Sequence, residues 1–395
     1  MATTKVSGEL VDLNESTSES GLKIPTGTNT NRPATDVSGM VRNNTNETSD
    51  GSASCEEYYS GAAWKKINNV VIPPPLAFKT LTYSGNGSTQ SITGLGFKPD
   101  LVWIKNRNGT NPHGLWDSTR GAGKLIKFNA NEEETGNAGD LMGSFDADGF
   151  QVNRQYLTNT AYDNTNWGAG TYVAWCWKAN GGTTSSNTDG STTSTVQVYP
   201  EAGFSIVKYT GTGANASVGH GLGVDPKLII IKKTSGASDW VAGVSDWTKY
   251  LEPNGSPGFR TSNVWQDTAP TSSVFTLTTG GDTNGNGAEY IAYCFADADN
   301  VSKIGTYTGT GSTQTITTGF APNFIITKDV SITDNWRMYD SVRGFEKILY
   351  PNLSDQEDDN NTFITGTEST GFNLGTGNGS NRSGSTYIYI ALKTN

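Results

Sequence analysis

The sequence of 395 residues has few of the residues on which catalytic and metal sites are usually built. It contains two histidines and three cysteines, and Cys55, Cys176 and Cys294 lack the spacing of metal ligands. This odd number of cysteines predicts reduced thiols and synthesis in a cytoplasm. Few residues could form a Ser-His-Asp triad, because the sequence contains only two histidines. We therefore expect no catalytic site, no metal site and no cofactor, in a protein that is not an enzyme.

Positive charge and long apolar runs are also scarce. The chain has 28 Lys and Arg against 38 Asp and Glu, a net charge of −10, and no basic patch. Because nucleic-acid binding needs clustered Lys and Arg, we expect no nucleic-acid partner. No apolar stretch is as long as a membrane span, and the first residues lack the apolar core of a secretion signal. We expect neither membrane insertion nor secretion.

Gly, Thr, Ser and Asn are abundant, and no long amphipathic helical period occurs. This composition predicts short strands joined by turns, and therefore an all-β fold. One phrase of sequence also recurs. Residues 83–105 read YSGNGSTQSITGLGFKPDLVWIK, residues 307–328 read YTGTGSTQTITTGFAPNFIITK, and a weaker copy spans residues 209–233. Each copy is followed by a closing apolar strand (YVAWCWK, YIAYCFA, YIYIALK), so the sequence predicts three homologous modules.

Within each phrase, a Gly- and Ser-rich turn between two short strands predicts a β-hairpin. The strands that begin after Pro99, Pro226 and Pro322 are apolar on both faces, so we place them centrally, between two layers. Each module is thus predicted to be a jelly-roll-like β-sandwich, after an extended and mostly irregular N-terminal segment. The predicted parts are an extended tail (1–24), a neck (25–75), module 1 (76–180), a Thr/Ser/Gly linker (181–199), module 2 (200–298) and module 3 (299–395).

A D-S-x-R-G element occurs in the first and third modules, whereas SDWTK stands roughly in its place in the second. It predicts an Asp-capped turn with the Arg folded over it, bracing the edge of the sandwich. The alternative is a site where the Arg holds a ligand carboxylate or a sugar. Duplication favours the structural turn, because a brace serves the fold wherever the module is reused. The residues concerned are Asp117, Arg120, Gly121, Asp340, Arg343 and Gly344.

Other polar groups are interpreted as parts of loops. Asp146 and Asp148 resemble a fragment of a calcium loop but lack the full ligand set, so a turn is favoured. The acidic run over residues 355–359 predicts a solvated loop, and His220 a loop residue. Several tryptophans lie in polar stretches, and their rings suit sugar faces and subunit interfaces alike. The candidates for surface recognition are Trp240, Trp247, Trp265 and Trp336.

The first 75 residues differ in kind and resemble a segment of bacteriophage tail-fibre and appendage proteins. The resemblance lies in an Ile-Pro-Thr-Gly start, an Arg-Pro, a Gly-Met-x-Arg strand and a Glu-x-Tyr-x-Gly-x-x-Trp motif. The three modules are similar to repeats in structural proteins of marine phages, especially those of cyanobacteria. The residues that the resemblance assigns to virion anchoring and trimerisation are Ile24, Pro25, Arg32, Pro33, Met40, Tyr59 and Trp64.

These resemblances imply a virion protein, made in the host cytoplasm and most simply a tail fibre. The apolar residues of the first 75 are too sparse to close a core of their own against the cost of ordering the backbone. We therefore expect three sister chains to share them, with the N-terminus docked on another virion protein and the modules facing a host glycan or protein. The alternatives are a capsid decoration or head-fibre protein and a polysaccharide-degrading tailspike.

Overall fold

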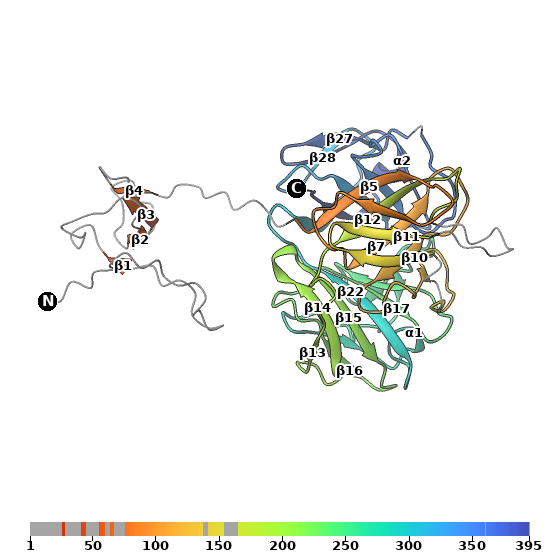
Figure 1. The fold of residues 1–395 in the computed structure, drawn as a ribbon, viewed down its shortest axis with the longest axis horizontal. Coiled ribbons are helices and arrows are strands. Elements are labelled where there is room, and N and C mark those ends of the chain that lie inside the picture. The colour runs from red at the N-terminus through yellow and green to blue at the C-terminus, as the bar shows by residue number, and fades with distance from the viewer. Residues whose placement is uncertain are drawn as a thin grey trace. The chain divides into compact units, whose positions relative to one another are not determined.

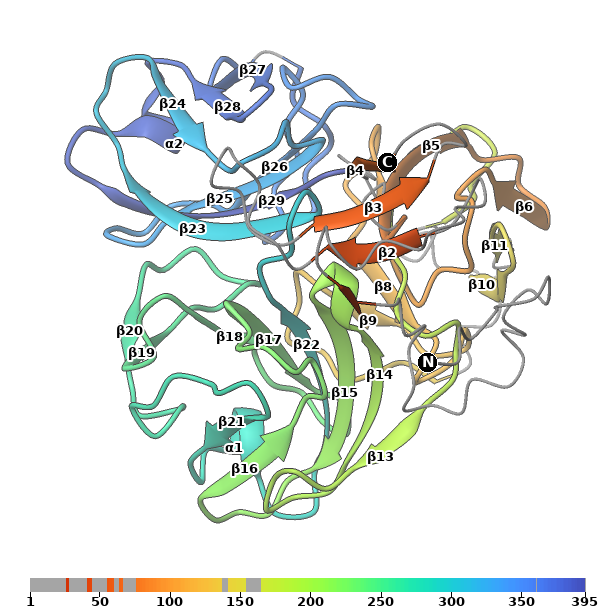
Figure 2. The same cartoon turned by 90° about the vertical axis from the view of Figure 1, so that its left-hand side faces the viewer.

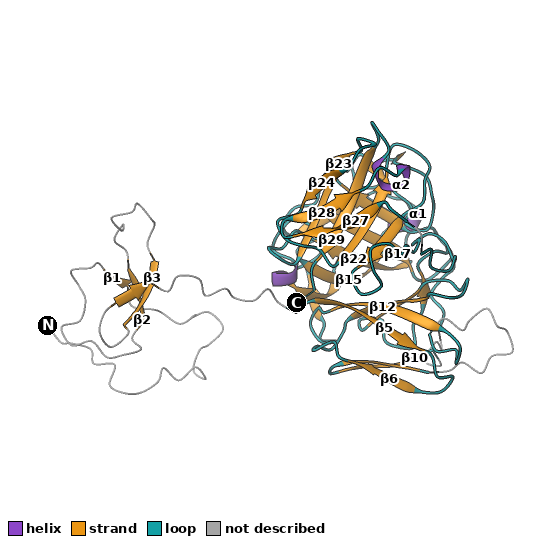
Figure 3. Ribbon diagram, turned by 90° about the horizontal axis from the view of Figure 1, so that it is seen from above, coloured by secondary structure: helices purple, strands orange, loops and turns teal. Residues whose placement is uncertain are grey.

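The computed structural model describes residues 26–27, 41–44, 55–59, 64–66, 76–136, 141–153, 165–359 and 361–394. The chain forms two compact units, Met1–Pro73 and Pro74–Asn395 (Figure 1). Strands dominate the described residues, which confirms the predicted all-β class (Figure 3). The helices are short: α1 (Gly281–Asn284), α2 (Asn378–Asn381) and a 3-10 helix at Pro200–Ala202. No helix among the described residues has the length and apolar character needed to cross a membrane.

The described residues of the first unit form one small sheet. Its order is β1-β2-β3-β4, with β1 parallel to β2 and the other pairs antiparallel. Tyr59 and Trp64 stand opposite each other where β3 pairs with β4. The strands are β1 (Thr26–Gly27), β2 (Val41–Asn44), β3 (Cys55–Tyr59) and β4 (Trp64–Lys66).

The second unit contains three sets of strands, which we call lobes 1, 2 and 3. Lobe 1 comprises β5 (Phe78–Ser84), β6 (Gln90–Thr93), β7 (Leu101–Asn106), β8 (Gly114–Asp117), β9 (Ile126–Lys127), β10 (Met142–Asp146), β11 (Gly149–Val152) and β12 (Thr171–Trp177). Lobe 2 comprises β13 (Ser185–Asn187), β14 (Ser194–Tyr199), β15 (Phe204–Thr210), β16 (Ala216–Gly219), β17 (Leu228–Lys233), β18 (Val241–Val244), β19 (Lys249–Tyr250), β20 (Arg260–Thr261), β21 (Val274–Leu277) and β22 (Glu289–Phe295). Lobe 3 comprises β23 (Ser302–Thr308), β24 (Gln314–Thr317), β25 (Phe324–Asp329), β26 (Arg337–Asp340), β27 (Ile364–Glu368), β28 (Gly371–Leu374) and β29 (Thr386–Leu392).

The same pairing pattern recurs in the large sheet of every lobe. Figure 2 shows it in lobe 2, with β15, β22 and β17, and in lobe 3, with β23, β29 and β25. The orders are β5-β12-β7-β8-β9 in lobe 1, β13-β14-β15-β22-β17-β18 in lobe 2 and β23-β29-β25-β26 in lobe 3. In each, the closing strand lies between the strand that opens the repeated phrase and the strand after the Pro. A smaller sheet covers one face: β10-β11-β6 in lobe 1, β16-β21 in lobe 2 and β24-β28-β27 in lobe 3. Lobe 2 also contains the pair β19-β20.

Two local predictions are wrong. The repeated phrase is not a hairpin, because β5 pairs with β12 and β6 pairs with β11, in opposite sheets. The same holds for β15 with β16 and for β23 with β24. Residues 181–199 are not a simple linker either, since they contain β13 and β14, which extend the large sheet of lobe 2. The alternating sequence STVQVY of β14 follows β15 along its full length, which the Ser/Thr-rich composition of the segment conceals.

The turn inside each phrase is instead fixed by a buried asparagine. Asn166, Asn284 and Asn381 each accept a hydrogen bond from a backbone N–H of the turn and donate to a carbonyl oxygen there. Beside each, two tyrosines stack with ring centroids 5.0–5.2 Å apart: Tyr83 on Tyr172, Tyr209 on Tyr290 and Tyr307 on Tyr387. The phrase therefore builds a crossing between the two sheets of one lobe.

Each large sheet has two buried faces, which explains its doubly apolar strands. One face packs on the small sheet of its own lobe, where Cys176, Cys294 and Ala391 occupy equivalent buried positions. The other face joins one hydrophobic core common to all three lobes, with Trp175, Leu228 and Ile390 among its members. An apolar cavity of about 40 Å³ lies among side chains of the three lobes there. The lobes thus close around a shared core, which is the second layer that the sequence required without identifying.

Candidate functional site: the junctions between lobes

Three junctions join the lobes, and corresponding backbone contacts mark them. Glu134 N–H of lobe 1 donates to Thr234 O of lobe 2 at 3.2 Å, which marks junction 1–2. Phe259 N–H of lobe 2 donates to Val330 O of lobe 3 at 2.9 Å, which marks junction 2–3. Glu357 N–H of lobe 3 donates to Arg107 O of lobe 1 at 2.8 Å, which marks junction 3–1. Side chains at equivalent positions of the three junctions can therefore be compared directly.

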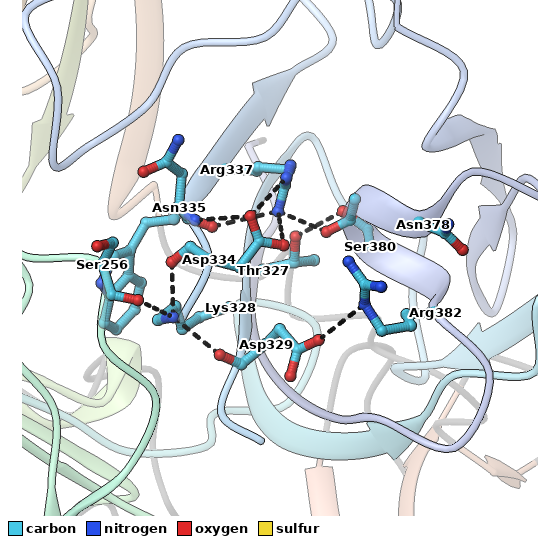
Figure 4. A network of polar contacts seen from close by, with 12 residues as sticks. Ser256, Thr327, Lys328, Asp329, Asp334, Asn335, Arg337, Asn378, Ser380 and Arg382 are labelled. Atoms are coloured by element: carbon cyan, nitrogen blue, oxygen red, sulfur yellow. Dashed lines mark hydrogen bonds and ion pairs between the residues drawn. The ribbon is translucent and has the colours of Figure 1, made fainter. Parts of the chain in front are cut away.

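A buried lysine reaches across each junction from the strand after the Pro. Lys328 Nζ donates to Ser256 O of lobe 2 at 3.0 Å, and to the carbonyl oxygens of Asp329 and Asp334 in its own lobe (Figure 4). Lys105 Nζ likewise donates to Ser354 O of lobe 3 at 3.1 Å. Lys232 Nζ donates to Asn131 O of lobe 1 at 3.1 Å. Each lysine thus ties its lobe to the preceding one in a closed ring of three.

Burial makes the charge of these lysines costly. It lowers the pKa of Lys105 to about 7 and that of Lys232 and Lys328 to about 8, while nearby carboxylates act in the opposite direction. Each Nζ has carbonyl oxygens around it, and for Lys105 and Lys328 there are three acceptors. Three acceptors match the three N–H donors of an ammonium group. The lysines are therefore structural groups. Because their pKa values are lowered, they lose a proton at a lower pH than exposed lysines do.

Junction 3–1 contains the D-S-x-R-G element of lobe 3. Asp340 Oδ1 accepts the backbone N–H of Arg343 at 2.9 Å, and Oδ2 accepts the Arg343 Nε–H at 2.6 Å. Gly344 follows with φ of 99°, the left-handed conformation that glycine adopts without strain. Trp175 of lobe 1 donates its Nε1–H to Asp340 Oδ2 at 3.1 Å, and its ring lies under the Arg343 guanidinium. The turn therefore braces a junction between lobes as well as the edge of its own sandwich.

A bidentate ion pair completes junction 3–1. Arg107 of lobe 1 donates to both carboxylate oxygens of Glu357, at 2.9 and 2.6 Å. Arg343 Nη1 also donates to Glu357, at 3.0 Å. Burial raises the pKa of Glu357, but the two arginines together lower it by more than burial raises it. The pKa of Glu357 therefore lies below its usual value. The prediction of a solvated acidic loop is wrong for Glu357, whose side chain is only 6% exposed.

Junction 1–2 repeats the Asp-Arg turn of junction 3–1, with a tyrosine in place of the tryptophan. Asp117 accepts the backbone N–H of Arg120 at 2.8 Å and its Nε–H at 2.5 Å, and Gly121 follows with φ of 100°. Tyr293 of lobe 2 donates its hydroxyl to Asp117 at 2.7 Å, from the position that Trp175 holds in lobe 1. Burial and the neighbouring Asp117 raise the pKa of Tyr293 well above its usual value. Arg120 Nη1 reaches Glu134 at 3.1 Å.

Junction 2–3 has an apolar version of the same set. Val244 stands opposite Leu228, just as Asp117 stands opposite Leu101 and Asp340 opposite Phe324, so it occupies the Asp position. The corresponding substitutions replace the arginine, glutamate and aromatic donor together: Trp247 at the Arg position, Phe259 at the Glu position and Ile390 at the position of Trp175 and Tyr293. The middle repeat therefore lacks the D-S-x-R-G element, and junction 2–3 also lacks the glutamate and the aromatic donor that contact this element at the other two junctions.

A polar cavity of about 280 Å³ lies between lobes 1 and 2. Lobe 1 contributes Arg120 and Glu134, and lobe 2 contributes a Lys208–Glu289 ion pair of 3.1 Å on another part of the lining. Threonine, serine and tyrosine side chains complete the lining, namely Thr119, Thr234, Ser235 and Tyr290, together with Lys124. The cavity thus offers charged donors and acceptors beside the D-S-x-R-G element.

The tryptophans predicted for surface recognition are mostly buried. Trp240 and Trp265 have no exposed surface and Trp336 has 4%, so the prediction of an outward role is wrong for these three. Trp240 Nε1–H donates to Lys127 O of lobe 1, and Trp336 Nε1–H donates to Glu252 O of lobe 2, so both serve junctions. Trp247 is half-buried and packs edge-on against Trp265. The contacts of Trp240 and Trp336 could not be predicted from neighbouring residues, because their partners lie in another lobe.

The remaining predicted sites lie as follows. Asp148 accepts backbone N–H groups of Gly94 and Gly96, as a turn residue does. His220 lies in the loop directly after β16, as predicted, and its side chain is buried there, which lowers its pKa. No cluster of three or more His, Cys, Asp or Glu suited to a metal occurs among the residues whose positions are described. Of the anchoring residues, the side chains of Tyr59 and Trp64 and all of Ile24, Pro25, Arg32, Pro33 and Met40 lie outside the described residues.

Several junction residues were missed from the sequence. The three lysines end the repeated strands PDLVWIK, PKLIIIK and PNFIITK at the same position, and that recurrence was the available signal. Glu134 and Glu357 each follow their arginine by fourteen residues, a spacing that the two D-S-x-R-G modules share. Arg107 gives no such signal, because its partner is 250 residues away.

Comparison with known proteins gives a family but no activity. A search of curated proteins found no match to this chain. A family model described as a domain of unknown function, DUF7483, matches residues 74–395. This match coincides with the second compact unit, Pro74–Asn395, so the three lobes together form the family domain. The chain therefore belongs to the DUF7483 family.

Proposed function

We propose that the protein is a non-enzymatic structural component of a phage virion, in the first place a tail fibre. The observation that carries the proposal is the use of the buried charged groups. Asp117 and Asp340 bind the arginines of their turns and an aromatic donor of another lobe. Buried carboxylates and guanidinium groups, which serve as catalytic groups in many enzymes, here hold the three lobes around one core. Such interlocking suits a part that must stay folded outside the cell.

The N-terminal unit supplies the attachment in this proposal. Its phage-like sequence motifs include the strands β2, β3 and β4 of a small sheet. We propose that three chains join through this segment and that its first residues dock on another virion protein. Residues 74–395 then form the body that faces the host, and surface loops, rather than the buried tryptophans, make the contact with a glycan or protein.

The location can be tested on particles of the source phage. A gold-labelled antibody against residues 76–395 is expected to label the tail in electron micrographs, with a non-immune antibody as control. Label over the capsid would instead support a decoration or head-fibre protein. Absence of the chain from purified particles, checked by mass spectrometry, would refute virion membership altogether.

The absence of enzymatic activity needs a separate test. Purified protein is expected to leave the size distribution of host-surface polysaccharide unchanged in gel filtration. A fall in polymer size that a single carboxylate substitution abolishes would contradict the proposal and support a tailspike.

A further inference from the structure

The two charged junctions differ at one position that controls an open space. At junction 3–1, Arg107 contributes the carbonyl that accepts Glu357 N–H, and its guanidinium forks onto the Glu357 carboxylate. At junction 1–2, Thr234 contributes the equivalent carbonyl, to Glu134 N–H. The short threonine side chain cannot reach across as arginine does. It lines the 280 Å³ cavity instead.

Glu134 is consequently held less completely than its counterpart. Glu357 has two arginine partners and is 6% exposed, whereas Glu134 has one arginine partner and is 14% exposed. Lys124 covers its other oxygen, with Nζ 2.9 Å from Oε1, and is itself 46% exposed. An exposed lysine of this kind gains little from its ion pair and is readily displaced.

Junction 3–1 shows where the equivalent lysine lies when an arginine is present. Lys347 is the counterpart of Lys124, four residues after its own arginine. Where Arg107 is present, Lys347 Nζ lies 3.7 Å from Glu357 Oε1, while the arginine Nη2 lies 2.6 Å from the same oxygen. A planar guanidinium can give both carboxylate oxygens a hydrogen bond at once, and an ammonium group cannot match that geometry.

We propose that the cavity at junction 1–2 binds the guanidinium group of an arginine side chain on a partner protein, in the place that Arg107 fills at junction 3–1. The guest guanidinium donates to both oxygens of Glu134, and Lys124 takes the more distant position that Lys347 has at junction 3–1. The short side chain of Thr234 leaves space for the guanidinium. The Lys208–Glu289 ion pair, which also lines the cavity, provides charged groups for the rest of the bound arginine. This inference does not depend on virion membership.

The test counts binding sites on the full-length chain with N-acetyl-arginine amide, by NMR titration of backbone amides. The wild-type chain is expected to bind one molecule at junction 1–2, and N-acetyl-lysine amide is expected to bind at least tenfold more weakly. Glu134→Gln is expected to weaken binding at least tenfold. Equal affinity for the two amides, or binding that survives Glu134→Gln unchanged, would overturn the proposal.

Two matched variants exchange the junctions. Thr234→Arg supplies the guanidinium from within the chain, so it is expected to abolish binding and leave the fold intact. Arg107→Thr is expected to open a second site at Glu357, which raises the stoichiometry from one to two, and the ligand is expected to restore part of its lost thermal stability. A Thr234→Arg chain that still binds with wild-type affinity, or no binding to the wild-type chain at all, would refute the assignment.

Discussion

Replacement of Asp340 by Asn tests the junction account at its most buried charge. Asp340 and Arg343 both have side chains with no exposed surface, and their ion pair is 2.6 Å long. The carboxylate also accepts the Val342 N–H at 3.1 Å and the Trp175 Nε1–H of lobe 1 at 3.1 Å. The substituted side chain would present an amide N–H₂ group where one carboxylate oxygen now accepts hydrogen bonds.

The magnitude follows from what the substitution leaves behind. Arg343 would keep Glu357 as its carboxylate partner and lose the closer of its two counter-charges. Removing one partner of a buried ion pair costs about 3–5 kcal/mol, and the Arg343 guanidinium would then depend on the single, more distant carboxylate of Glu357. We expect a loss of that size in the free energy of unfolding.

Urea denaturation followed by tryptophan fluorescence measures this loss without adding salt that screens charges. Asp359→Asn is the matched control: its side chain is 64% exposed and lies 3.7 Å from Lys347. An exposed pair contributes less than about 1 kcal/mol, so the control is expected to unfold almost as the wild-type chain does. A loss below about 1 kcal/mol for Asp340→Asn would refute the reasoning, because the buried pair would then contribute no more than a surface pair.

Three further predictions concern junction 1–2, the buried Lys105 and the N-terminal unit. Tyr293→Phe removes only the hydroxyl that donates to Asp117, and urea denaturation is expected to show a loss of about 1.5–3 kcal/mol; an unchanged midpoint would contradict this. Because the pKa of Lys105 is lowered to about 7 in the fold, the unfolded chain binds more protons between pH 7 and about 10. Stability is therefore expected to rise with pH from about 7 to about 9, more steeply than in Lys105→Met; equal slopes would show that the carbonyl acceptors keep the ammonium form. Deletion of residues 1–73 is expected to leave a folded body that no longer trimerises in light scattering, whereas a trimer of the truncated chain would place the interface on the lobes.

Much of the fold could be predicted from local sequence. Strands were recognisable from apolar runs after Pro99, Pro226 and Pro322, which precede β7, β17 and β25. Cys176 and Ala391 stand at the same position of the recurring closing strands, and both have no exposed surface. These features were accessible because strand periodicity and turn chemistry act over a few residues.

The candidate site depends on contacts that no local pattern reports. Trp240 and Trp336 each follow a polar residue in the sequence, yet backbone carbonyls of another lobe accept their indole N–H groups. The partners of Arg107 and Trp175 lie 250 and 165 residues away. Strands that are apolar on both faces indicate that both faces of the sheet are covered. Three large sheets that share one core cover the second face as well as a separate sandwich would, so the sequence pattern cannot distinguish the two arrangements. The closed arrangement follows only from the tertiary structure.

Hydrogen exchange in mild urea, followed by mass spectrometry, tests the central claim that the three lobes form one interlocked body. Peptides from the closing strands β12, β22 and β29 report one lobe each, and each strand contributes side chains to the shared core. The account predicts the same free energy of opening for all three strands, and the same decrease in all three on Asp340→Asn. Opening of β22 at an unchanged free energy in that variant, while β29 opens more easily, would show that the lobes unfold independently and would contradict the account.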